Sequence, residues 1–302
     1  MHYLKAIQLL KYYKAMNLEN YSVKFRSMLY DTVNQNQHRQ NNSLIQVESK
    51  VLNSNNILFS KESKTLAQVN TSKILMYNEH NTKLNNHSTN MSKNIDRSGH
   101  YNSSEIVSNI KTLSQLENSV REFDGCELKR GALNTVFGDG NPNAKIMAIG
   151  EAPGAQEDKM GIPFCGESGK LLNKMFESIG LYRDKNLYIT NTVFWRPPNN
   201  RRPTEDELEI CRPFVAKHIS IIQPKIIIMV GATAISALLN EKLNITQARR
   251  NYYSYSNQYL NHKIQTTPIF HPAYLLRQPN KKKEAWEDLL LIKEYLESND
   301  LL

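Results

Sequence analysis

Residues 146–154 read IMAIGEAPG, an apolar run followed at once by a turn that is rich in glycine and proline. A second segment of the same form, residues 264–277, reads IQTTPIFHPAYLLR. Short apolar runs bounded by such turns are typical of buried strands. In open α/β sheets, ligands bind beyond the carboxyl ends of the strands. The two segments therefore predict a ligand site formed by the loops that follow residues 149 and 270.

Expected strands and helices alternate from residue 111 to residue 302. Helices are predicted at residues 113–123, 166–179, 204–222, 233–239 and 281–296, and strands at residues 145–149, 186–190, 225–230 and 264–270. Thr204 and Glu207 have the spacing of a helix-capping box. Because the strands are almost entirely apolar, both faces of the sheet should be covered. The expected fold is a three-layer α/β/α domain around a central parallel sheet of about four strands.

The first third of the chain has a different composition. Residues 30–105 are rich in Asn, Ser, Lys and Gln and have no sustained hydrophobic period. Such a sequence buries too little apolar surface to offset the entropy lost on ordering, although an AT-rich genome explains the Asn content equally well. We expect a weakly ordered or disordered extension at residues 1–110, with a short helix at 4–16, and a folded domain at residues 111–302.

The net charge of +9 suits a polyanionic partner. Residues 1–110 carry 13 Lys and Arg against 7 Asp and Glu, whereas residues 111–302 carry 25 against 22. No apolar stretch reaches the ~20 residues of a membrane span, and the first residues lack a signal-peptide core. Three cysteines are too few for a disulfide framework. We expect a monomeric, cytoplasmic, nucleoid-associated protein with no membrane partner.

Two phosphate-binding interpretations of these loops fail on spacing. Gly150 and Gly154 lack the intermediate glycine of a dinucleotide-binding turn. Residues 166–170, GESGK, superficially resemble a P-loop. Phe164 stands where the first P-loop glycine belongs, and Leu171 stands where a hydroxyl would hold magnesium. The spacing thus disfavours nucleotide hydrolysis.

Several further motifs follow the first loop in a fixed order. They are PFCGESG at residues 163–169, Thr190-Asn191, RPPNNR at 196–201, Ile245-Thr246 with Arg249, and HPAYLLR at 271–277. The ordered set, which covers residues 126–290, resembles the uracil-DNA glycosylase superfamily and is most similar to its bacterial and archaeal branch, family 4. This resemblance implies an enzyme that starts base-excision repair by hydrolysing the bond between uracil and deoxyribose in DNA. No lysine occupies the position of a nucleophile, so we expect a monofunctional enzyme.

The resemblance also implies a pocket for a uracil that has flipped out of the DNA stack. Phe164 would stack on the base, and His271 would donate a hydrogen bond to uracil O2 and stabilise the leaving anion. The Asn191 amide has one donor and one acceptor that match uracil and oppose cytosine. The rest of the pocket is expected from Gly150, Ala152, Pro153 and Gly154.

A carboxylate is expected near the sugar, which becomes cation-like as the base departs. The best-known uracil glycosylases have an aspartate before the motif proline, whereas this chain has Ala152. By resemblance to family 4, the candidates are Glu157, Glu151 and Asp158. We favour Glu157 for activating water and Glu151 for shaping the loop, and a surface role suits Asp158 equally well.

The DNA contacts are also expected from the resemblance. Leu275 and Leu276 would provide an apolar wedge that enters the gap left by the flipped nucleotide. Phosphate contacts are expected from Arg277, Arg196, Arg201, Arg202 and Arg249. Arg250 stands where the family commonly has a glycine after Arg249.

The family usually carries an iron–sulfur cluster on four cysteines. Cys126 and Cys211 match two of the four positions, whereas Phe123 and Trp195 stand at the others. Cys165 belongs to the uracil-site motif and does not replace them. Because such a cluster takes four thiolates, we predict that the protein has no cofactor and that the two aromatic side chains fill the volume.

Two alternatives to uracil excision remain open from the sequence. One is a non-catalytic DNA-binding relative that associates with replication or repair machinery through residues 1–30. The other is a glycosylase for a different deaminated base, because residue identity does not define the breadth of the pocket. The expected partner in each case is DNA, single- or double-stranded.

Overall fold

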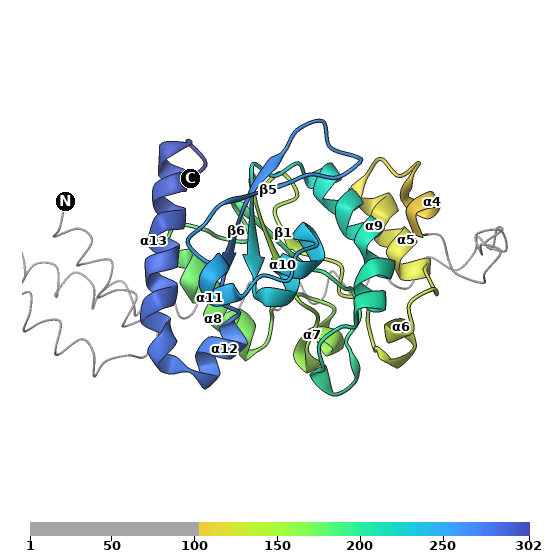
Figure 1. The fold of residues 1–302 in the computed structure, drawn as a ribbon. Helices are drawn as coiled ribbons and strands as arrows, with labels where there is room; N and C mark the ends of the chain where they lie inside the picture. The colour runs from red at the N-terminus through yellow and green to blue at the C-terminus, as the bar shows by residue number, and fades with distance from the viewer. Residues whose placement is uncertain (1–102) are drawn as a thin grey trace, which may run out of the picture. The chain divides into compact units, whose positions relative to one another are not determined.

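The computed structural model describes residues 103–302, in which helices cover both faces of a central six-stranded sheet (Figure 1). The strand order is β1-β3-β2-β4-β6-β5. Four parallel strands form the centre, namely β2 (Ile146–Gly150), β3 (Leu187–Asn191), β4 (Ile226–Val230) and β6 (Ile264–Ile269). This confirms the three-layer α/β fold with about four parallel strands.

Two edge strands were not expected from the sequence. β1 (Asp139–Gly140) pairs antiparallel with β3, and β5 (Tyr253–Tyr255) pairs antiparallel with β6, so the whole sheet is mixed. Both strands are too short to give a recognisable alternation of apolar and polar residues. They extend the sheet without changing its parallel centre.

One face of the sheet packs against the helices α4 (Ser103–Val107), α5 (Leu113–Glu122), α9 (Glu205–Ile222) and α10 (Ala232–Leu239). The strands contribute Met147, Ile149, Ile227 and Met229 to this core. Their neighbours Ile146, Ala148, Ile226 and Ile228 point to the other face, as the two-residue period of a strand requires.

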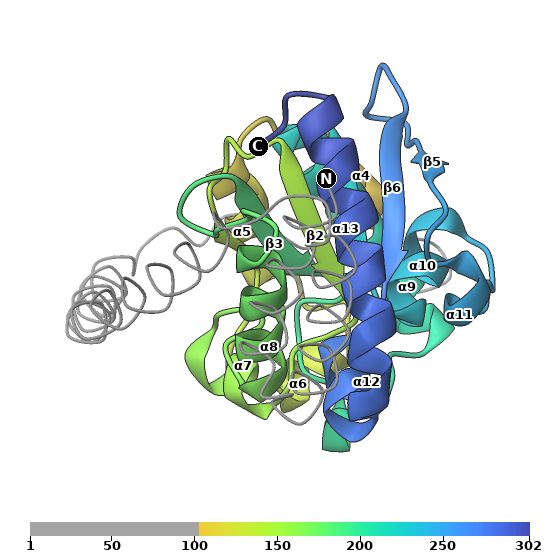
Figure 2. The ribbon, with the colours of Figure 1, turned by 90° about the vertical axis from the view of Figure 1, so that its left-hand side faces the viewer.

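That second face is covered by α8 (Glu167–Glu177), α12 (Pro272–Arg277) and α13 (Lys282–Ser298), which lie over the sheet in Figure 2. The short elements α6 (Leu128–Gly131), α7 (Ala155–Met160), η1 (Pro198–Asn200), α11 (Ile245–Ala248) and η2 (Pro279–Lys281) lie in the connections. Several of these follow the carboxyl ends of strands, where the sequence predicts the site.

The capping box predicted for α9 is confirmed. The Thr204 hydroxyl accepts a hydrogen bond from Glu207 N at 3.2 Å, and Glu207 Oε2 accepts one from Thr204 N at 2.7 Å. Glu207 also accepts two hydrogen bonds from the Arg201 guanidinium. This contact with Arg201 lowers the pKa of Glu207, so the carboxylate stays ionised at neutral pH and forms an ion pair with the guanidinium.

Within the described residues, the core includes side chains upstream of residue 111, where the composition predicts that the domain starts. Val107 and Ile110 belong to the core beside α9, because α4 packs against that helix. The helix predicted at residues 4–16 and most of the predicted extension lie outside the described residues. Within residues 103–302, no helix is both long and apolar enough to cross a membrane.

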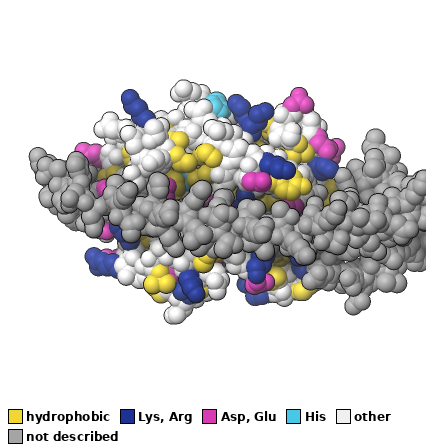
Figure 3. All heavy atoms as spheres, turned by 180° about the vertical axis from the view of Figure 1, so that it is seen from behind, with side chains coloured by type: hydrophobic (Ala, Val, Ile, Leu, Met, Phe, Trp, Pro, Cys, Tyr) yellow, Lys and Arg dark blue, Asp and Glu magenta, His cyan; other side chains and the backbone are white. Residues whose placement is uncertain are grey.

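Charged side chains on the face opposite to that of Figure 1 are dispersed. In the visible part of Figure 3, Lys and Arg stand singly or next to Asp and Glu, with apolar side chains between them. That part of the surface forms no continuous basic track.

Candidate active site

A cavity of about 670 Å³ opens at the carboxyl ends of the four parallel strands. Strand register brings its walls together, because Gly150 at the end of β2 pairs with Asn191 at the end of β3. The loops after β4 and β6 complete it. Its lining includes Glu151, Ala152, Pro153, Gly154, Glu157, Phe164, Ser168, Asn191, Arg201, Arg202, Gly231, Thr246, Phe270, His271, Tyr274 and Arg277.

Gly150 allows the two recognition groups of the cavity to approach each other. A Cβ atom at this position would lie 2.3 Å from Phe164 Cζ and 2.6 Å from Asn191 Oδ1. Both distances are far below van der Waals contact. The glycine that ends β2 thus leaves space in which an aromatic ring and an amide face the same volume.

Asn191 is a buried amide without a partner. Its side chain is 1% exposed, and neither Nδ2 nor Oδ1 makes a hydrogen bond within the described part of the chain. Leaving a buried polar group unpaired typically costs about 1–3 kcal/mol. An amide kept in this state at the wall of a cavity is therefore available to a ligand that offers one acceptor and one donor.

Phe164 has a backbone conformation that is unusual for a bulky residue. Its φ of 53° lies in the left-handed region, which typically costs roughly 1–3 kcal/mol for a non-glycine residue. A Cβ at Gly169 would lie 1.8 Å from Phe164 O, so α8 packs directly against this turn. The turn aims the ring at the cavity, where its centroid lies 5.9 Å from that of His271.

His271 caps the N-terminus of α12 with its side chain. Nδ1 accepts a hydrogen bond from Ala273 N at 3.2 Å, which requires the unprotonated form of that nitrogen. Burial, followed by the nearby Arg277, lowers the pKa of His271 to about 4. The imidazole is therefore neutral at pH 7, with its proton on Nε2 as a hydrogen-bond donor.

The three candidate acids occupy different environments. Glu151 lines the cavity, and its Oε2 accepts a hydrogen bond from Thr233 Oγ1 at 2.5 Å. Glu157 also lines the cavity, and its Oε1 accepts one from Gly166 N at 2.8 Å. Asp158 is 2% exposed and turns away, since its Oδ1 accepts hydrogen bonds from the backbone N–H groups of residues 133 and 134. The structure thus brings two of the three acids to the cavity.

The expected apolar wedge is divided between two environments. Leu275 is fully buried in the core between α12 and the sheet, whereas the neighbouring Leu276 is 44% exposed. Successive residues of a helix point in directions about 100° apart. The prediction that Leu275 contacts DNA therefore conflicts with its burial, and Leu276 is the leucine of this pair that can reach a partner.

The arginines predicted to contact phosphates divide in the same way. Arg201, Arg202 and Arg277 line the cavity, and Arg196 lies beside it, where its Nε donates to Asn200 Oδ1 at 2.8 Å. Arg249, in contrast, has a side chain that is only 7% exposed and pairs with Glu284 and Asp288 of α13. The expectation that Arg249 meets phosphate is not compatible with this burial.

Arg250, the residue at the family's glycine position, has a φ of 69° and pairs with Glu287 and Asp288. The left-handed backbone explains why a glycine suits this position. The loop is thus attached to α13 by two adjacent arginines.

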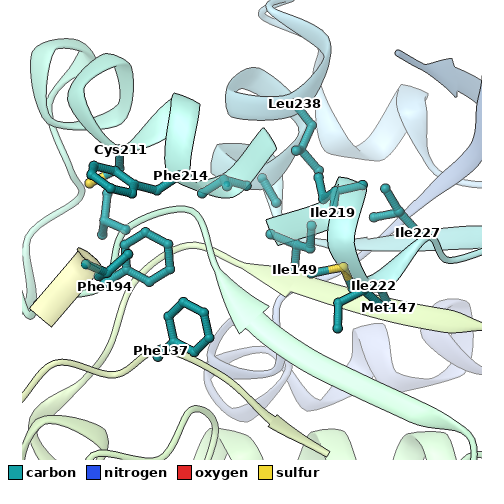
Figure 4. Close-up of a cluster of buried hydrophobic side chains, with 14 of the residues drawn as sticks. Phe137, Met147, Ile149, Phe194, Cys211, Phe214, Ile219, Ile222, Ile227 and Leu238 are labelled. Carbon is teal, nitrogen blue, oxygen red and sulfur yellow. The ribbon is translucent and has the colours of Figure 1, made fainter. Parts of the chain in front are cut away.

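The positions expected to hold an iron–sulfur cluster are filled by an aromatic core. Phe123 and Trp195 are buried, their ring centroids are 6.4 Å apart, and Trp195 Nε1 donates to Thr135 Oγ1 at 3.0 Å. Cys126 and Cys211 are buried beside them, and Figure 4 shows Cys211 next to Phe214 and near Phe194. Among residues 103–302, no three His, Cys, Asp or Glu side chains are grouped to hold a metal ion. The residues present do not fit a four-cysteine cluster.

Two hydroxyl groups at the site were not identified from the sequence. Thr192 Oγ1 donates to the carbonyl of Glu151 at 2.6 Å, and Thr233 donates to its carboxylate. Both residues follow the carboxyl end of a parallel strand, where the sequence predicts the ligand site. Applying that rule to the loop after β4 would have found Thr233.

Fold and cavity together define an α/β protein whose cavity is lined by an aromatic ring, an unpaired amide and a neutral imidazole. The family model described as "Uracil DNA glycosylase superfamily" matches residues 137–290. The chain belongs to this superfamily, which confirms the resemblance seen in its motifs.

Curated relatives agree with this assignment. The type-4 uracil-DNA glycosylase of Saccharolobus solfataricus is 41% identical over 197 residues, covering 64% of this chain and 90% of the relative. That of Sulfurisphaera tokodaii is 40% identical over 190 residues, covering 61% and 85%. That of Thermotoga maritima is 38% identical over 180 residues, covering 59% and 91%.

Proposed function

We propose that this protein initiates base-excision repair by removing uracil from DNA. It is a uracil-DNA glycosylase and hydrolyses the bond between N1 of uracil and C1′ of deoxyribose. The buried, unpaired amide of Asn191 is the observation that carries this function. Release of uracil from a duplex with a single uracil tests it directly.

In this proposal the flipped uracil stacks on Phe164 and pairs with Asn191. Uracil presents an N3–H donor and an O4 acceptor, which match the amide oxygen and the amide N–H₂. Cytosine presents the opposite pattern and would leave buried polar groups unpaired, which strongly disfavours it. The fixed position of Asn191 at the end of β3 supports this selection, because β-sheet hydrogen bonds hold its backbone in place.

His271 supplies the donor for the leaving group. As the glycosidic bond breaks, its electron pair passes to uracil and negative charge develops on O2. A neutral imidazole with a proton on Nε2 donates a hydrogen bond to this oxygen. The low pKa and the hydrogen bond accepted by Nδ1 both favour this neutral form.

Glu157 activates the water that attacks C1′. The new C–O bond forms as the C–N bond breaks, and the water gives a proton to the carboxylate, from which it reaches the uracil anion. Gly166 N anchors one oxygen of Glu157, which leaves Oε2 for the water. Glu151 shapes the loop instead, since Thr233 holds its carboxylate.

We expect Glu157→Gln to slow single-turnover excision by roughly 100-fold, the scale of losing a general base. Glutamine keeps an oxygen for Gly166 N but cannot accept the proton of water. Glu167→Gln, a change of an exposed acid in α8, serves as the control and should excise at the parental rate. Normal excision by Glu157→Gln, with Glu151→Gln inactive, would show that the roles of these two acids are reversed.

DNA binding is proposed to involve Leu276 as the inserted side chain, with Arg277, Arg202, Arg201 and Arg196 near phosphates. The exposure of Leu276 and the place of the arginines at the mouth of the cavity support this arrangement. Phosphate contacts of this kind give affinity that is independent of sequence and sensitive to salt. Arg249 is left out because its side chain is buried against α13, where it pairs with Glu284 and Asp288. Arg201 also has an acidic partner, Glu207, but its side chain is exposed.

We also propose that the protein works without an iron–sulfur cluster. Purified protein should be colourless, hold no stoichiometric iron and remain folded in strong chelator. Trp195→Cys should destabilise the domain by about 3–5 kcal/mol, the usual cost of truncating a buried Trp. It should not restore iron binding, because Phe123 still occupies a ligand position. Iron near four atoms per chain in anaerobically prepared protein would contradict this prediction.

Residues 1–102 are proposed to act as a basic tether that binds DNA without sequence preference. The protein itself is proposed to be monomeric and to be located with DNA in the cytoplasm. Residues 1–102 contain 13 Lys and Arg against 6 Asp and Glu, and they also offer a segment for a replication or repair partner. Deleting residues 1–102 should leave an active domain whose affinity for undamaged DNA is lower at low salt but equal at high salt. An insoluble truncated protein, or one without cooperative unfolding, would show that the segment is structural.

A further inference from the structure

The turn that carries Phe164 requires support from outside itself. A bulky residue with a φ of 53° leaves this conformation unless its surroundings fix it. The close approach of Gly169 to Phe164 O restrains one side of the turn. The carbonyl groups of Pro163 and Phe164 are restrained by a different residue.

Arg183, between α8 and β3, binds both carbonyls. Its Nη1 donates to Pro163 O at 2.7 Å, and its Nη2 donates to Phe164 O at 2.6 Å. Such a pair of parallel bonds uses the planar fork of a guanidinium, which the single ammonium of lysine does not reproduce. The contact fixes two successive carbonyl groups relative to each other and thereby the direction of the ring.

The guanidinium is itself held by two other elements. Nε donates to Asn173 Oδ1 of α8 at 2.9 Å, and Nη1 pairs with Asp139 Oδ2 of β1 at 3.1 Å. The Arg183 side chain is largely buried among these groups. The edge strand β1 therefore helps to hold the guanidinium, because its pairing with β3 places Asp139 beside Arg183.

We infer that Arg183 is a positioning residue for uracil recognition, which acts by holding Phe164 in the conformation that stacks on the base. It lies outside the set of residues that line the cavity, so its effect passes through the turn. The inference rests on the proposed stacking of uracil on Phe164. Arg183 thus contributes to base selection indirectly, and Asp139 and Asn173 hold its guanidinium in place.

A double-mutant cycle of Arg183→Met and Phe164→Ala tests this, with kcat and KM measured on duplex DNA that contains one uracil. Arg183→Met should lower kcat/KM by about 100-fold, the scale of a small misplacement of a binding group. In the Phe164→Ala background the same change should have little further effect, because residues that act as one unit are not additive. Arg183→Lys should retain an intermediate rate.

Binding to a duplex without uracil should be unchanged in Arg183→Met, since phosphate contacts lie elsewhere, whereas general loss of structure would weaken it. Arg121→Met is the control, because Arg121 forms an exposed pair with Glu117 on α5. If Arg183→Met does not fold, Asp139→Asn removes one support and leaves Arg183 in place. Its loss of rate should likewise disappear in the Phe164→Ala background.

Two outcomes separate failure of this inference from failure of the proposed stacking. Equal losses from Arg183→Met in both backgrounds, with Phe164→Ala itself slow, would overturn the role of Arg183 alone. Phe164→Ala excising uracil at the parental rate would instead remove Phe164 from the uracil site. The inference about Arg183 would then fail with it.

Discussion

Asn191→Asp is expected to lower the rate of uracil excision by about 10- to 100-fold. An ionised aspartate keeps an acceptor for uracil N3–H but has no donor for O4, so it faces a uracil oxygen with a negative charge. A buried acceptor left without a donor costs about 1–3 kcal/mol, and each 1.4 kcal/mol is a factor of ten in rate. The preference for uracil over cytosine should shrink for the same reason.

The measurement is single-turnover excision from duplexes that differ only in carrying uracil or cytosine at one position. Asn299→Asp, at the exposed C-terminal end of α13, introduces the same charge away from the cavity and serves as the control. Thermal unfolding of both variants separates loss of recognition from loss of structure. Parental excision of uracil by Asn191→Asp, with cytosine still refused, would remove Asn191 from the pocket.

His271→Ala should slow the chemical step by roughly two to three orders of magnitude, the usual effect of losing one donor to a developing oxyanion. Binding of DNA should be nearly unchanged, because the interaction strengthens only as the base departs. His262→Ala, a change of an exposed histidine between β5 and β6, provides a matched control. A His271→Ala variant that excises normally would show that another group stabilises the leaving uracil.

The pH dependence of the parent protein gives a second test of His271. Because its pKa is lowered to about 4, the catalytic form should persist from neutral pH down to about pH 5 and be lost as the pH falls through about 4. Stability should decline earlier, between about pH 6.5 and 4, because the unfolded chain binds protons there while the buried neutral imidazole does not. Burial lowers the pKa of His218 to about 3, which adds to this decline with the same sign.

The central fold was predictable because its strands are short apolar runs that end in recognisable turns. The same strand ends predicted where the ligand site lies, since parallel strands bring their carboxyl ends to one edge. The roles of Glu151, Asn191 and His271 were expected from the resemblance to the glycosylase family. The two-residue strand β1 was missed because it has no pattern of its own. β1 is stabilised by its pairing with β3 and by the salt bridge between Asp139 and Arg183. Both contacts join residues that are far apart in sequence.

Two expectations about DNA contacts conflict with burial for a similar physical reason. Arg249 suggested a phosphate contact, but its partners Glu284 and Asp288 are distant in sequence and become neighbours only when α13 packs beside the loop. Leu275 and Leu276 were not distinguishable, because the six residues of α12 are too few to define an apolar face. Burial of the short helix against the sheet decides between them.

Alkali-revealed cleavage of an end-labelled duplex with one uracil tests the central claim most directly. The parent protein, assayed in the presence of a strong chelator, should convert the uracil site to an alkali-labile abasic site and release one free uracil for each site. A duplex with cytosine or thymine in that position should stay intact. An intact uracil strand after treatment with excess, folded, DNA-binding protein would contradict the account.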